Sequence, residues 1–172
     1  MTTISMNSPN VESSPPISLL GNSLLIRADE GRILRAFGHA IVVLLDGKQT
    51  DGKYTTFLNV TPPGGGPGPH YHEREDEWVY IIEGRVSFLQ NGTWTDLFPG
   101  DCVYSPRGSV HGFKNKTDQP IRVFINTAPA GFEHFFAEAA EAWAKPEPDM
   151  TRMAAIEDKY GVHGVDTTYG TE

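Results

Sequence analysis

The sequence has little of what a membrane protein or a nucleic-acid-binding protein needs. Its longest uninterrupted apolar run, residues 40–45, is far too short to cross a bilayer, so we expect no membrane partner. Positive charge is also scarce, because 14 lysine and arginine residues face 22 carboxylates, for a formal net charge of -8. A surface of this sign repels phosphate backbones, so we expect no nucleic-acid partner.

Cysteine is almost absent as well. The one cysteine, Cys102, has no intrachain partner for a disulfide, which fits a reducing compartment. Residues 1–18 show neither a basic start nor an apolar stretch, so we expect no signal peptide and a cytoplasmic protein. The first 20 residues are rich in serine, proline and asparagine, which predicts a flexible N-terminal arm over residues 1–20.

Most of the remaining sequence is typical of short β-strands. Turn signals such as Asp46-Gly47 and Asn91-Gly92 separate apolar or alternating segments, roughly one turn every ten residues. The expected strands cover residues 24–27, 40–46, 54–61, 77–82, 86–90, 94–98, 102–105, 110–115 and 121–128. Strands at this spacing, with no helix between them, favour an antiparallel sandwich or barrel over residues 21–130.

The chain changes character after Pro129. Aromatic and small apolar side chains then recur at three-and-four spacing, which predicts an amphipathic helix over residues 131–143. Pro146 and Pro148 end this helix, and Asp149 is expected to cap a second short helix that stops before Gly161. We therefore expect residues 131–172 to be a helical extension packed outside the β-structure.

Two patterns of metal-ligating residue types lie within the β region. The first holds His70, then His72 two residues later and Glu77 five residues after that, and the second contributes His111. Side chains two residues apart in a strand point to the same face, so the first two histidines face one way. Three imidazoles and one carboxylate suit a divalent transition metal (Fe, Mn, Ni, Co, Cu or Zn) rather than Mg or Ca. We expect these four side chains to bind one such ion.

The strand that carries Glu77 is expected to alternate between two environments. Odd positions of this strand face the interior together with Glu77, and even positions face the opposite side. The outward side therefore carries Trp78, Tyr80 and Ile82, an apolar surface that calls for a covering partner. Together with the aromatic helix, this surface predicts a homodimer.

Together the two patterns resemble the two defining motifs of the cupin superfamily, and they match at every anchor residue from Gly64 to Asn115. The resemblance implies an all-β, single-domain jelly-roll barrel with one metal at its centre. Residues 51–52, 106–108 and 129–133 are also similar to single-domain cupins of the quercetin 2,3-dioxygenase-like group. In that group a short C-terminal helical segment follows the barrel.

The resemblance also implies a reaction. In quercetinase-like cupins the matching glutamate takes the proton of the flavonol hydroxyl, so Glu77 is the expected catalytic residue. Four protein ligands leave two open positions in an octahedral site, which suit a substrate oxygen and dioxygen. We expect a dioxygenase acting on a quercetin-type flavonol or related enolisable aromatic compound, with Val79, Ile81 and Phe113 as pocket walls.

Two other functions stay open on the sequence alone. A non-redox cupin of the isomerase or decarboxylase type would use the metal only as a Lewis acid. A small-molecule-binding cupin would hold a structural metal whose coordination is closed.

Overall fold

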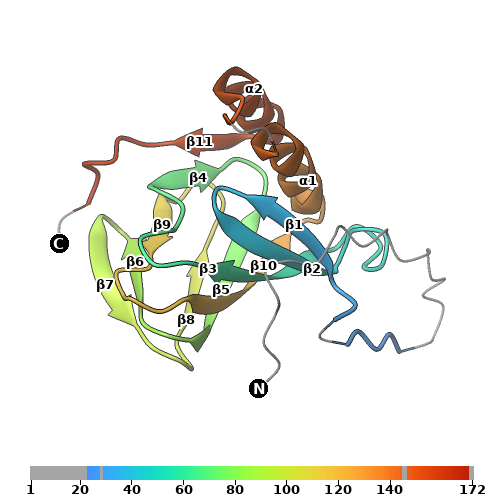
Figure 1. The fold of residues 1–172 in the computed structure, drawn as a ribbon, viewed down its shortest axis with the longest axis horizontal. Helices are drawn as coiled ribbons and strands as arrows, with labels where there is room; N and C mark the ends of the chain where they lie inside the picture. Colours follow the sequence, from blue (N-terminus) through green and yellow to red (C-terminus); the bar gives the residue numbers. More distant parts are fainter. Residues whose placement is uncertain (1–22, 28, 145–146, 171–172) are drawn as a thin grey trace.

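The computed structural model describes residues 23–27, 29–144 and 147–170, and Figure 1 shows their arrangement. The expected N-terminal arm, residues 1–20, lies outside these residues. The strands are β1 (Arg32–Ala36), β2 (His39–Leu45), β3 (Thr55–Thr61), β4 (His70–His72), β5 (Asp76–Glu83), β6 (Val86–Gln90), β7 (Thr93–Leu97), β8 (Cys102–Ser105), β9 (His111–Lys114), β10 (Ile121–Ala128) and β11 (Val162–Gly164). Residues 24–27 form no strand, and the sequence does not predict β1, β4 or β11.

The strands form two antiparallel sheets. One has six strands in the order β1-β2-β3-β10-β5-β8, and the other has five in the order β11-β4-β9-β6-β7. Large side chains from both sheets, among them Phe57 and Phe88, share one buried core between them.

The prediction of a closed jelly-roll barrel is therefore corrected, because the two sheets are not closed into a barrel. Within the described residues no strand of one sheet pairs with a strand of the other, so two layers face each other instead. The physical reason is the core, because sheets packed through side chains stand about 10 Å apart, whereas hydrogen-bonded strands lie about 4.8 Å apart.

Strand β5 shows the alternation that the sequence predicts. Val79 and Ile81 are fully buried, whereas Trp78 and Tyr80 are 38% and 45% exposed. The strand lies between β10 and β8, where Val79 pairs with a residue of each neighbour. This register places the side chain of Glu77 on the inner face of the sheet.

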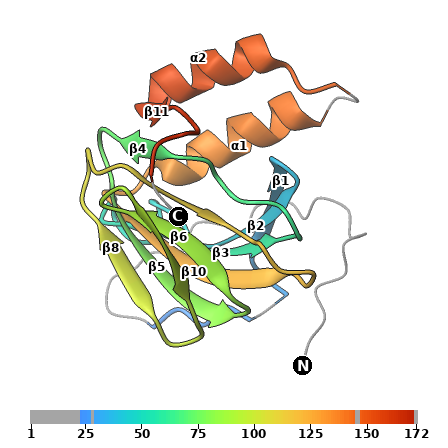
Figure 2. The same cartoon turned by 90° about the vertical axis from the view of Figure 1, so that its left-hand side faces the viewer.

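Both expected helices are confirmed, as α1 (Phe132–Trp143) and α2 (Met150–Tyr160). The side chain of Asp149 caps α2 by accepting a hydrogen bond from the amide of Arg152 at 3.0 Å, and Gly161 ends it in a left-handed conformation. Figure 2 shows the two helices together over one end of the sheets. Of the described helices, the longest has 12 residues, and none has the length and apolarity to span a membrane.

The C-terminal extension is not purely helical. After α2 the chain forms β11, which pairs antiparallel with β4 and places Val162 opposite His72. The extension is therefore hydrogen-bonded to the strand that carries two of the expected metal ligands.

Candidate metal centre and cavity

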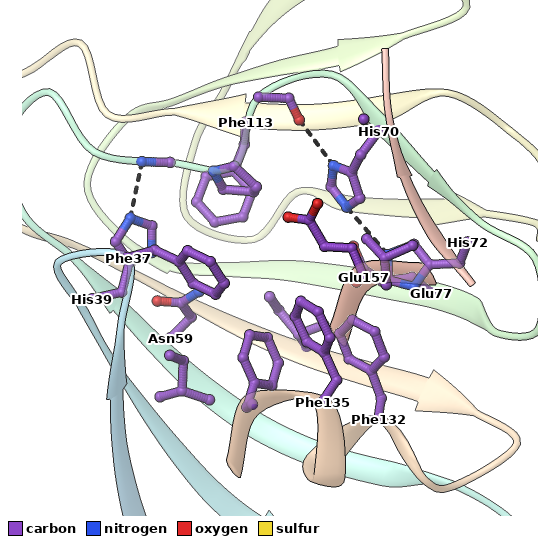
Figure 3. Close-up of a pocket in the computed structure, with 18 of the residues that line it drawn as sticks. Phe37, His39, Asn59, His70, His72, Glu77, Phe113, Phe132, Phe135 and Glu157 are labelled. Atoms are coloured by element: carbon purple, nitrogen blue, oxygen red, sulfur yellow. Dashed lines mark hydrogen bonds between the residues drawn. The ribbon is translucent and has the colours of Figure 1, made fainter. Parts of the chain in front are cut away.

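Three of the four expected ligands come from neighbouring strands of the five-stranded sheet. His70 and His72 are the two ends of β4, and His111 opens β9, where it pairs with His70 across the ladder. The two-residue spacing in β4 puts both of its histidines on the inner face, as Figure 3 shows. His70 and His111, which are 41 positions apart in the sequence, thus meet because their strands are adjacent.

The three imidazoles are close enough to share one ion. Nε2 of His70 lies 3.1 Å from Nε2 of His72, and ligand nitrogens of all three histidines lie within 4.8 Å of one another. The side chains of His72 and His111 are buried, and His70 is half-buried. Glu77 reaches them from β5 of the other sheet, with its Oε1 atom 3.4 Å from Nε2 of His111. The compact group therefore comprises the three histidines, and Glu77 adjoins it through His111.

Backbone carbonyl groups orient the rings of His70 and His111 through their Nδ1 atoms. Nδ1 of His70 donates to the carbonyl oxygen of Gly68 at 2.9 Å, and Nδ1 of His111 donates to that of Ser109 at 3.0 Å. A carbonyl only accepts hydrogen bonds, so both rings carry their proton on Nδ1 and present the lone pair of Nε2. This is the arrangement in which ligating histidines are oriented by acceptors behind them.

Behind His72 lies the carboxylate of a residue that the sequence does not predict to belong to the site. Glu75 is 5% exposed, and its Oε2 atom lies 3.6 Å from Nδ1 of His72. Burial by the surrounding strands turns it into a partner of the site, and its spacing of three residues from His72 is the only local signal.

The residues present fit a divalent transition metal. Nε2 of His111 is buried and has no hydrogen-bond partner among the described residues. Nε2 of His70 and Nε2 of His72 are only 3.1 Å apart, so both nitrogens can face the same ion. Burial, and then the neighbouring histidines, lower the pKa of His70 to about 3, so its ring is neutral and available as a ligand.

Glu77 supplies the negative charge of the group. Burial raises the pKa of its carboxyl, but the contact with His111, and then the influence of the other two histidines, outweighs burial and brings it to about 2. Conversely, burial lowers the pKa of His111, and Glu77 more than reverses this effect. The centre thus combines the anionic carboxylate of Glu77 with the ring nitrogens of the three histidines.

A cavity of about 390 Å³ opens beside His70, His72 and Glu77. It is lined mainly by aromatic rings, those of Phe37, Phe57, Phe113, Phe132, Phe135 and Phe136. Of the three expected wall residues, Phe113 lines this cavity, while Val79 and Ile81 lie in the core and do not. A volume of this size falls within the range of sites for small organic ligands.

Helix α1 supplies three of these phenylalanines. Their spacing along the helix is visible in the sequence, where it predicts packing against the sheets. The structure shows that the same face of α1 also closes the cavity, and the ring of Phe132 lies 4.6 Å from that of His72, measured between centroids. The helices are thus not merely packed outside the β-structure.

The cavity has a polar group away from the histidine cluster. Nε2 of His39 accepts a hydrogen bond from the amide of Gly66 at 3.1 Å (Figure 3). Burial lowers the pKa of His39, against the effect of its hydrogen bond with Asn59, so its ring is neutral. This arrangement makes His39 a hydrogen-bonded structural residue of the cavity wall.

Comparison with known families identifies the class of protein that carries this centre. Residues 57–126 match the family Cupin_2, described as a cupin domain. That segment runs from β3 into β10 and includes all four expected ligands. This segment therefore matches a cupin domain, as its two motifs predict.

Two curated proteins illustrate the range of relatives. The chain is 32% identical over 89 residues to quercetin 2,3-dioxygenase from Bacillus subtilis, an alignment that covers 52% of this chain and 26% of the relative. It is 31% identical over 67 residues to tetracenomycin polyketide synthase protein TcmJ from Streptomyces glaucescens, covering 39% of this chain and 45% of the relative. The chain thus spans less than half the length of either relative.

Solved structures support the fold. A predicted oxalate decarboxylase from Thermotoga maritima superposes with a TM-score of 0.58 at 23% identity, covering 62% of this chain and 99% of that one. The polyketide cyclase RemF from Streptomyces resistomycificus gives a TM-score of 0.54 at 22% identity, covering 62% and 80%. At these identities the similarity establishes a shared fold.

Proposed function

We propose that this protein is a metal-dependent dioxygenase that cleaves a flavonol-like or related enolisable aromatic substrate. The observation that carries the proposal is the position of three convergent imidazoles beside a cavity lined by phenylalanine rings. The similarity to a quercetin 2,3-dioxygenase over half of the chain supports the same substrate class.

In this proposal His70, His72, His111 and Glu77 hold one divalent transition metal, whose identity among Fe, Mn, Ni, Co, Cu and Zn is left to experiment. When bound, the ion would supply charge stabilisation for a substrate oxyanion and the means to use dioxygen. The hydrogen bonds from the Nδ1 atoms of His70 and His111 keep their rings in the ligating tautomer.

Glu77 is the residue to which we assign proton transfer. Its carboxylate is ionised, lines the cavity and is steadied by its contact with His111. It would accept the proton of a ring hydroxyl that enters beside it. The phenylalanine rings would hold the flat substrate and exclude water from the reacting end.

The test is an oxygen electrode and an absorption spectrum recorded together. Protein loaded separately with Fe, Mn, Co or Ni and mixed with quercetin should consume oxygen as the flavonol absorbance disappears. Protein treated with a chelator is the control and should do neither. Loss of flavonol without oxygen uptake would favour a non-redox cupin. No loss with any of these four ions, nor with Cu or Zn, would overturn the proposal.

The proposal includes a homodimer in the cytoplasm, with dioxygen and a small-molecule substrate as its other partners. The outer face of β5 and β8 presents Trp78 and Tyr104, whose ring centroids are 5.0 Å apart, beside the exposed Tyr80 and Ile82. Burying these rings between two copies would stabilise a dimer. Sedimentation of a monomer at micromolar concentration would contradict the dimer, and cell fractionation tests the location.

A further inference from the structure

The cavity contains a second carboxylate that belongs to neither cupin motif. Glu157 lies on α2, and Figure 3 shows its side chain pointing into the cavity that His70 and Glu77 also line. The residue is half-buried. Within the described part of the chain, its carboxylate makes no hydrogen bond and no ion pair. An acidic group without a protein partner among the described residues is thus placed on the wall of a cavity that phenylalanine rings also line.

The position of Glu157 is fixed by contacts of α2 with the core, with α1 and with the strand that follows it. Met153 and Ile156 are buried on the core side of the helix, which sets the rotation of the helix about its axis. Lys159 and Tyr160 both bond Glu138 of α1, at 2.5 and 2.7 Å. The chain then enters β11, which is hydrogen-bonded to β4.

The partial burial of Glu157 makes its negative charge more costly than that of an exposed carboxylate. Burial raises the pKa of its carboxyl, and no positive side chain opposes that effect. Most acidic side chains of a protein avoid such a cost by facing solvent, as the neighbouring Asp158 does. An unpaired acidic group that faces a cavity is a common mark of a binding site.

We infer that Glu157 determines ligand specificity in this cavity, by accepting a hydrogen bond from a hydroxyl group of an aromatic ligand and by disfavouring ligands that carry a carboxylate. This inference rests on the proposed function, because it takes the metal centre as the place where the ligand's other end binds. An ionised carboxylate only accepts hydrogen bonds, so the complementary ligand group is a donor.

Charge supports the second half of the inference. Glu77 and Glu157 both face the cavity, and the His39 ring that lines its polar side is neutral. A small dicarboxylate would gain attraction from a divalent metal but meet the repulsion of Glu157. A neutral polyhydroxylated aromatic compound would meet no such repulsion, and it would fill the space between the phenylalanine rings.

The experiment measures binding rather than turnover. Isothermal titration of the metal-loaded protein with quercetin under nitrogen, and separately with oxalate, is compared for wild type, Glu157→Ala and Glu157→Gln. Asp158→Asn is the matched control, because this residue is adjacent on the same helix but exposed. Metal content and circular dichroism establish that each variant is loaded and folded.

We expect Glu157→Ala to weaken quercetin binding about tenfold, the size of one hydrogen bond to a charged group. Both Glu157 variants should bind oxalate more tightly, again by about tenfold, because both remove the negative charge. Glu157→Gln should lose less affinity for quercetin, since an amide oxygen can still accept the hydrogen bond. Asp158→Asn should leave the affinity for both ligands unchanged.

The outcomes separate this inference from the proposed function. If wild-type protein binds quercetin but consumes no oxygen, the dioxygenase proposal fails and the role of Glu157 stands. If quercetin is turned over but the Glu157 variants bind both ligands as wild type does, the inference alone is overturned. If wild type does not bind quercetin, the titration with oxalate is the test. Unchanged oxalate affinity in Glu157→Gln would then overturn the inference.

Discussion

The cupin segment and the C-terminal extension contribute different things to one site. Residues 57–126 hold all four expected metal ligands on strands whose motifs are visible in the sequence. The extension after Pro129 holds none of them, yet α1 and α2 supply Phe132, Phe135, Phe136 and Glu157 to the cavity wall. The first region therefore carries the features that this chain shares with other cupins, and the second carries those that shape the cavity.

The two regions differ in how freely their residues can be substituted. A metal site requires particular ligand residues at fixed positions, so few substitutions are possible at those positions of β4, β5 and β9. A cavity wall requires only shape and polarity, so a helical extension can vary while the centre stays the same. The predictions below separate the two contributions, from the largest expected effect to the smallest.

Removing a ligand should abolish the centre while leaving the extension intact. His72→Ala should reduce metal content well below about one ion per chain, because it leaves only two imidazoles and the carboxylate of Glu77 in the donor set. Elemental analysis of purified protein measures this directly. His134→Ala, on the exposed side of α1, is the control and should keep its metal. Full metal content in His72→Ala would show that the site has been misassigned.

Truncating the link between the two regions should destabilise both. Phe132 is 4% exposed and packs on His72, Phe57 and two phenylalanines of its own helix. Phe132→Ala should lower the free energy of unfolding by about 3–4 kcal/mol, the usual cost of such a buried cavity. Urea denaturation measures the change, and Phe98→Ala, at a 54% exposed position, is the control. A loss no larger than that of the control would show that α1 is only loosely docked.

The attachment of the extension should also depend on pH. The side chain of Glu133 accepts hydrogen bonds from the hydroxyl of Thr55 and the amides of Gly47 and Gly131. Burial raises the pKa of this carboxyl, but the hydrogen bonds outweigh burial and hold it below the ordinary value of 4.5. The stabilisation is therefore present above that value and is lost as the pH falls through the lower pKa of the folded state.

Glu133→Gln should accordingly cost about 2 kcal/mol of unfolding free energy at neutral pH and less in acid. Urea denaturation at about pH 7 and at about pH 4 measures the difference, with the exposed Glu147→Gln as control. If the variant and the wild type lose stability equally on acidification, the hydrogen bonds of Glu133 do not hold its pKa down.

The smallest effect concerns the carboxylate behind His72. Glu75→Gln should weaken metal affinity by about tenfold, the lower end of the effect of a group that orients a ligand. Glu73→Gln, an exposed position two residues earlier, should leave affinity unchanged. Competition with a metal-binding dye gives both values. An unchanged affinity in Glu75→Gln would mean that the 3.6 Å contact does not orient the ring.

Local patterns account for the parts of the structure that the sequence predicts. The inward and outward sides of β5, the two helices, the cap at Asp149 and the stop at Gly161 all follow from residues within a few positions of one another. The histidine cluster also follows, because His70 and His72 lie two residues apart and the motif supplies His111.

Pairing between distant segments accounts for the parts that the sequence does not predict. Strands β4 and β11 have three residues each, and β4 follows a glycine- and proline-rich segment. Segments this short are recognised as strands only once they pair with each other. The two sheets in place of a closed barrel likewise depend on how the strands pack together.

By itself, the sequence determined which residues can bind a metal and which faces are apolar, since both depend on residue type and short-range periodicity. The tertiary structure alone decided that Glu75 is buried behind His72, that α1 closes the cavity and that Glu157 points into it. The physical reason is that burial and contact between segments far apart in the chain depend on packing, which no local pattern records.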